Sequence, residues 1–105
     1  MQIQINTDKN ISGQYALVQS VEDILKSDLS RFSDQITRIE VHLSDEDSSA
    51  KSGMTDKRCL LEVRLAGERP IAISEQAETI EEAVTDATQQ MVNLLETELV
   101  KRGKW

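Results

Sequence analysis

His42 and Cys59 are the only histidine and the only cysteine in the chain, and such a pair could act as base and nucleophile. That chemistry requires the imidazole to lie within hydrogen-bond reach of the thiol. Each residue lies in a segment in which polar and apolar side chains alternate, one beginning near Arg38 and the other near Lys57. Cys59 falls on the apolar side of its segment and His42 on the polar side of its own. A bulge in either segment would change this parity. We therefore expect a buried, inert cysteine and a protein that is not an enzyme.

Asp45, Glu46 and Asp47 could attract a divalent cation. Their spacing lacks the glycine and the distant glutamate of a calcium loop, so a solvated polar loop over 45–56 explains them better. No glycine-rich phosphate loop, metal-ligand cluster or catalytic pair of carboxylates is recognisable in the sequence. We expect neither a metal nor a cofactor.

Two segments have the apolar spacing of amphipathic helices, with intervals of three and four residues. One runs from about Gln14 to Phe32, with Asn10 and Ser12 as candidate caps. The other is predicted over Thr79–Arg102, where Thr79 and Glu82 have the spacing of a capping box. The apolar stripe of this second helix comprises Ile80, Ala83, Val84, Ala87, Met91, Leu94, Leu95 and Leu99.

Four segments alternate polar and apolar residues as half-buried strands do. They begin near Gln2, Arg38, Lys57 and Pro70, and the last is predicted to be short, over Pro70–Ser74. The element order is β-α-β-β-β-α, and every element has one apolar face. The prediction is an α+β two-layer sandwich in a single domain over 1–105. Both helices would cover one face of a four-stranded sheet whose last three strands form an antiparallel meander.

The composition sets broad limits on the function. Twelve basic and 19 acidic side chains give a net charge of −7, which repels nucleic acid on average but leaves room for a local basic patch. No apolar run has the length of a membrane span, and the opening residues have no features of a secretion signal. With one cysteine, no internal disulfide can form, so we expect a reducing cytoplasm.

Several stretches resemble the family of ribosome hibernation-promoting factors and ribosome-associated inhibitors, also called sigma-factor modulation proteins. They are Met1–Ile5, Leu29–Ile36 and Ile39–Ser44, together with the helix opening Glu78–Val84. The resemblance covers nearly the whole chain and is carried by element order. It implies a cytoplasmic stress-response factor that docks on the small ribosomal subunit, contacts rRNA and regulates translation. Such a factor lowers translation or protects idle ribosomes without catalysing a reaction.

The resemblance makes basic side chains the candidate rRNA-binding residues. They are Lys26, Arg31, Arg38, Arg58, Arg64, Lys101, Arg102 and Lys104. Two alternatives stay open for them. The sheet arginines with His42 could form a weakly basic stripe or solvated cross-strand pairs with Glu40 and Glu62. The basic residues at the C-terminal end could contact RNA or stabilise the end of the helix through its dipole.

The sequence departs from the family pattern in its second helix, where Gln90 and Asn93 stand at a lysine and an arginine position. Asp28 similarly occupies a basic position. Between Pro70 and Val100 there are seven acidic residues and no Lys or Arg. The alternative function is therefore a protein-interaction module of the same fold that has lost rRNA binding.

In that alternative, Glu81, Glu82 and Asp86 would meet a basic protein partner. The same acidic face could also be merely solvated and keep the protein monomeric. An exposed sheet edge would permit a weak dimer, so the expected state is a monomer or a weak dimer.

Overall fold

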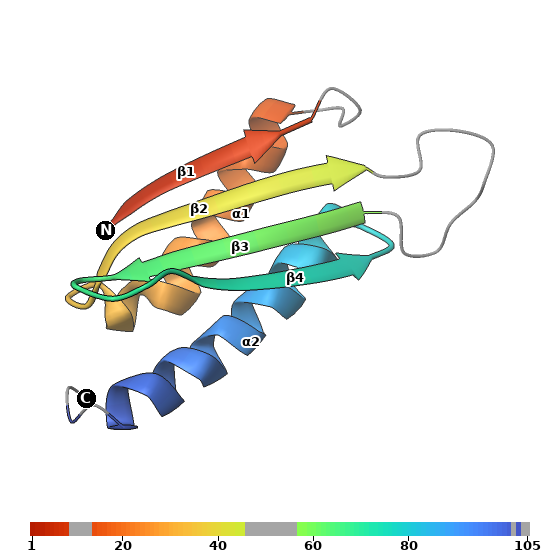
Figure 1. Ribbon diagram of the computed structural model, residues 1–105. Helices are drawn as coiled ribbons and strands as arrows, with labels where there is room; N and C mark the ends of the chain where they lie inside the picture. The colour runs from red at the N-terminus through yellow and green to blue at the C-terminus, as the bar shows by residue number, and fades with distance from the viewer. Residues whose placement is uncertain (9–13, 46–56, 102, 104–105) are drawn as a thin grey trace.

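The computed structural model describes residues 1–8, 14–45, 57–101 and 103, and the predicted β-α-β-β-β-α order is confirmed (Figure 1). The candidate caps Asn10 and Ser12, and the loop over 46–56, lie outside these residues. The elements are β1 (Gln2–Thr7), α1 (Gln14–Leu29), the 3-10 turn η1 (Ser30–Phe32), β2 (Ile36–Asp45), β3 (Lys57–Leu65), β4 (Ile71–Ala77) and α2 (Ile80–Lys101).

The strands lie in the order β1-β2-β3-β4. β1 runs parallel to β2, and β2, β3 and β4 form the predicted antiparallel meander. A parallel pair needs a crossover connection, which α1 provides. Both helices lie on the same face of the sheet, where α2 packs against β3, β4 and α1 (Figure 1). Among the residues that the structure describes, no helix covers the opposite face, here called the outer face.

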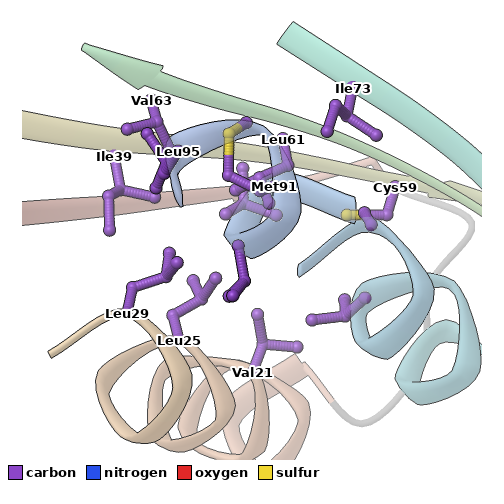
Figure 2. Packing of buried hydrophobic residues seen from close by; sticks show 14 of the residues in the cluster. Val21, Leu25, Leu29, Ile39, Cys59, Leu61, Val63, Ile73, Met91 and Leu95 are labelled. Atoms are coloured by element: carbon purple, nitrogen blue, oxygen red, sulfur yellow. The ribbon is translucent and has the colours of Figure 1, made fainter. Parts of the chain in front are cut away.

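The core lies between the sheet and the helices (Figure 2). Alternate residues of β2 and β3 point into it, because successive side chains of a strand point to opposite faces. Leu61 and Val63 are completely buried, as predicted. The other inward residues of these strands are also buried: Ile36, Ile39, Val41, Leu43, Cys59 and Leu65. The inner face therefore fixes the register of the central strands.

The predicted bounds of β4 are wrong at its carboxyl end. The strand runs to Ala77 and not to Ser74, because Glu75 pairs with Cys59 and Ala77 with Lys57. These backbone pairs depend on the distant strand β3, and the local sequence gives no sign of them. Pro70 precedes the strand, as its missing N–H allows.

The start of α2 agrees with the sequence prediction, and its buried stripe differs. The hydroxyl of Thr79 accepts a hydrogen bond from the N–H of Glu82 at 3.1 Å, which caps the helix. Leu94, predicted to be buried, is 40% exposed, whereas Thr88 and Val92 are buried. Leu94 lies on the flank of the helix beside the β3–β4 turn. Neither described helix has an apolar stretch long enough to cross a bilayer.

Candidate nucleic-acid interface

The outer face presents residues of like charge opposite one another. Arg38 of β2 lies opposite Arg64 of β3, and Glu40 lies opposite Glu62. Like charges placed directly across two strands destabilise the pairing. The side chains must therefore find partners along the strand or on the diagonal.

Arg38 finds its partner along its own strand. Its Nε and Nη2 atoms donate hydrogen bonds to Oε1 of Glu40 at 3.2 and 2.9 Å. This hydrogen bond holds the pKa of the Glu40 carboxyl below its usual value. Arg38 Nη2 also donates to the side-chain oxygen of Gln4 on β1, and Gln4 donates to Asn6 Oδ1 at 3.3 Å. The charges of the outer face are thus tied into a network that includes β1.

His42 lies at the other end of this network. Its Nε2 atom is 3.4 Å from Oε1 of Glu62 and 3.8 Å from Oε2 of Glu40. Its Nδ1 atom is 3.4 Å from the side-chain nitrogen of Asn6. The imidazole is 42% exposed, and the two carboxylates are slightly less so. One histidine therefore bridges the two opposed glutamates.

Cys59 lies on the opposite face of the sheet and is completely buried. Burial raises the pKa of its thiol to about 12, with a further contribution from the charge of Glu75. A thiol that stays protonated and faces the core cannot reach His42. The structure thus brings together no nucleophile–base pair at these two residues.

The candidate rRNA-binding residues fall into separate places. Arg38 and Arg64 are adjacent on the outer face. Arg58 lies six residues before Arg64 on the same face, about 20 Å away at the rise of a strand, and donates to Ser74 Oγ at 3.0 Å. Lys101 is exposed in the last turn of α2. The candidates Arg102 and Lys104 lie outside the part of the chain that the structure describes.

The other two candidates belong to the helical layer and are paired with acids. Lys26 of α1 bonds Glu22 at 3.1 Å, one helical turn away. Arg31 of η1 bonds Glu96 of α2 at 3.0 Å and lies over the ring of Phe32. The six candidates that the structure describes therefore do not form one continuous surface.

The acidic face of α2 is exposed at Glu81, Glu82 and Asp86. At the position where the family resemblance implies a lysine, Gln90 donates a hydrogen bond to Glu75 of β4. This contact was not foreseen from the sequence, because it needs the extended β4 to bring Glu75 beneath the helix. The interactions of Asp45 were also missed, since it belongs to β2 and pairs with Lys57 at 3.3 Å.

Gln4 and Asn6 are the other residues of the outer face that sequence reasoning missed. The alternation of β1 already put them on the polar side of that strand. What it could not give was the parallel register, which places Gln4 beside Glu40 and Asn6 beside His42. The interaction partners of the outer-face residues could therefore be assigned only once the strand register was known.

The element order and the exposed polar sheet define the chain as a small α+β protein of the two-layer class. A family model described as "Sigma 54 modulation protein / S30EA ribosomal protein" matches residues 3–102, and the chain belongs to this family. Members of this family are ribosome-associated factors and not enzymes, in agreement with the sequence-based expectation. A search of curated proteins gave no significant match.

Two solved structures resemble the chain in fold. One is the N-terminal domain of Protein Y from Thermus thermophilus, with a TM-score of 0.72 and 21% identity over 92% of this chain and 98% of that one. The other is a ribosomal subunit interface protein from Coxiella burnetii, with a TM-score of 0.71 and 17% identity over 95% of this chain and 99% of that one. At these identities the likeness is one of fold.

Proposed function

We propose that this protein is a cytoplasmic factor that docks on the small ribosomal subunit and lowers translation or protects idle ribosomes. The observation that carries the proposal is the family match over residues 3–102. The Coxiella burnetii structure of the same fold, described as a ribosomal subunit interface protein, supports it. Binding would act by occlusion and charge, since the family is not one of enzymes.

Within the candidate residues, the outer face is the best-supported rRNA contact. Arg38 and Arg64 lie directly opposite each other, so two guanidinium groups concentrate positive potential at one end of the sheet. Guanidinium groups also bind phosphate with two parallel hydrogen bonds. Lys26, Arg31 and Arg38 are each paired with a glutamate, so ion pairing does not separate the candidates. The case for the outer face rests on the position of Arg38 directly opposite Arg64.

The test is co-sedimentation of the purified protein with small ribosomal subunits at roughly 50 and 200 mM salt. Wild-type protein should sediment with the subunits and lose affinity steeply as salt rises. The double change Arg38→Gln and Arg64→Gln should lower the slope of log K against log salt by about 1.5, since each phosphate contact contributes roughly 0.7 to 0.9. The matched control, Lys26→Gln with Arg31→Gln, removes the same charge from the helical layer.

The following outcomes would contradict these assignments. Absence of co-sedimentation of wild-type protein at low salt would overturn the ribosomal proposal. A larger effect of the control pair, or of Lys101→Gln with Arg102→Gln, which removes the same charge, would move the contact away from the outer face. Both measurements use the intact chain.

A second candidate function is that of an interaction module that has lost rRNA binding. The observation that favours it is the exposed acidic face of α2, with Gln90 occupied by its bond to Glu75. A basic protein would fit this face by charge. Charge reversal through Glu81→Lys, Glu82→Lys and Asp86→Lys should then abolish binding of that partner while leaving subunit sedimentation absent.

Analytical ultracentrifugation would test the expected monomer or weak dimer.

A further inference from the structure

Three side chains with metal-binding atoms meet near the centre of the outer face. Glu40, His42 and Glu62 each offer one ligand atom, and these atoms all lie within 4.8 Å of one another. We propose that Glu40, His42 and Glu62 form a binding site for a divalent transition-metal ion of the zinc class. The site lies on the face opposite the helices, and the proposal does not rest on ribosome binding.

The distances fit such an ion. Zinc binds histidine nitrogen and carboxylate oxygen at about 2.0 to 2.2 Å, which separates the ligand atoms of a tetrahedral site by about 3.4 Å. His42 Nε2 lies 3.4 Å from the Glu62 oxygen and 3.8 Å from the Glu40 oxygen. Small rotations of the two carboxylates would close the set around one ion. The partial exposure of all three side chains leaves a remaining coordination position open to water.

The backbone already holds the three ligands in place. Glu40 and Glu62 are direct partners across β2 and β3, and His42 follows Glu40 by two residues on the same face. Sites built on paired strands are more rigid than sites on loops, so little conformational entropy is lost on binding. The ion would also relieve the repulsion between the two opposed carboxylates.

Neighbouring side chains orient the ligands without blocking them. The two hydrogen bonds from Arg38 to Glu40 both go to Oε1, whereas the oxygen that faces His42 is Oε2. Arg38 therefore fixes the carboxylate and leaves its second oxygen for the ion. Hydrogen bonds of this kind orient the ligands of metal sites.

Asn6 has the corresponding position for His42. Coordination through Nε2 requires the imidazole proton to reside on Nδ1, which lies 3.4 Å from the Asn6 side chain. Rotation of the Asn6 amide presents its oxygen to that proton and gives up the hydrogen bond from Gln4, whose own oxygen stays with Arg38. The ligand set itself selects the metal, because one imidazole with two carboxylates suits zinc better than magnesium or calcium.

The test is a calorimetric titration of the purified full chain with ZnSO₄, together with the visible absorption of the Co²⁺-loaded protein. Wild type should bind one equivalent, and Co²⁺ should give the absorption bands of tetrahedral coordination. His42→Gln and Glu62→Gln should each weaken Zn²⁺ binding at least about tenfold. Because His42 is the only histidine, its single ring-proton NMR signals should shift on addition of Zn²⁺.

The matched control is Glu22→Gln. Glu22 is also a partly exposed carboxylate engaged in an ion pair, but it lies on α1 away from the site. This variant should bind Zn²⁺ as wild type does, and circular dichroism should show that all variants are folded. The proposal is overturned if wild type binds no Zn²⁺, or if His42→Gln binds it unchanged.

Discussion

The two faces of the β2–β3 pair share one register and differ in what that register brings together. On the helix side, Val41 lies opposite Leu61, and both are completely buried. On the outer side, one residue away in each strand, Glu40 lies opposite Glu62. The inner pairs stabilise this alignment, whereas the outer pairs oppose it. The like-charged residues of the outer side find their partners along the strand and through His42 instead.

The first and largest expected difference between the faces is in reactivity. Because the pKa of the Cys59 thiol rises from 9.0 to about 12, its thiolate fraction near pH 8 should be about a thousandfold lower than in the unfolded chain. Alkylation by iodoacetamide at that pH should be correspondingly slow, and fast in denaturant. Rapid labelling of the native protein would contradict the burial of this side.

The same thiol predicts a pH dependence of stability. The unfolded chain loses the Cys59 proton near pH 9, while the folded chain keeps it up to about pH 12. The contribution of the thiol to the free energy of unfolding is therefore complete below pH 9 and declines as the pH rises through this window. Urea titrations along a pH series should show that decline, and Cys59→Ala should lack this component.

The next effect in size separates two neighbouring leucines. Leu61→Ala should lower the free energy of unfolding by about 2 to 5 kcal/mol, because it leaves a cavity in the core. Leu60→Ala is the matched control, since Leu60 belongs to the same strand but lies on the outer face, only partly buried. Its effect in urea denaturation should be much smaller. Equal losses for the two variants would remove the distinction between the faces.

The smallest expected effect is on thermal stability and concerns the like-charge pair of the outer face. Glu62→Lys replaces a like-charge pair with an opposite-charge pair and should raise the melting temperature by roughly 1 to 4 °C at low salt. The gain should shrink at high salt, where exposed charges are screened. Glu62→Gln should give an intermediate rise by calorimetry. A fall in melting temperature for both variants would mean that Glu62 is chiefly a partner that His42 needs.

The inner face was predictable because a strand repeats every two residues, so Leu61 and Val63 could be placed in the core from the sequence alone. The position of His42 away from Cys59 followed from the same parity. Leu94 was misplaced because one helical turn offers two adjacent apolar positions, and contact with the sheet decides which of them is buried. Local periodicity carries no information on that choice.

The outer face was only half predictable. Its residues could be named, but their partners depend on which strands are adjacent and in what register. The parallel alignment of β1 brings Asn6 to His42, and that contact joins residues 36 positions apart. The expectation that the chain binds no metal rested on spacing along the chain, which carries no information on how close Glu40, His42 and Glu62 lie in the sheet.

The hydrogen bond from Gln90 to Glu75 limits the effect of adding a positive charge to α2 at this position. Gln90→Lys would put an ammonium group against the carboxylate of β4, where the two charges would cancel. A net cationic spot there would require simultaneous replacement at both positions. Gln90→Lys alone would therefore neutralise Glu75 without making this face of the helix basic.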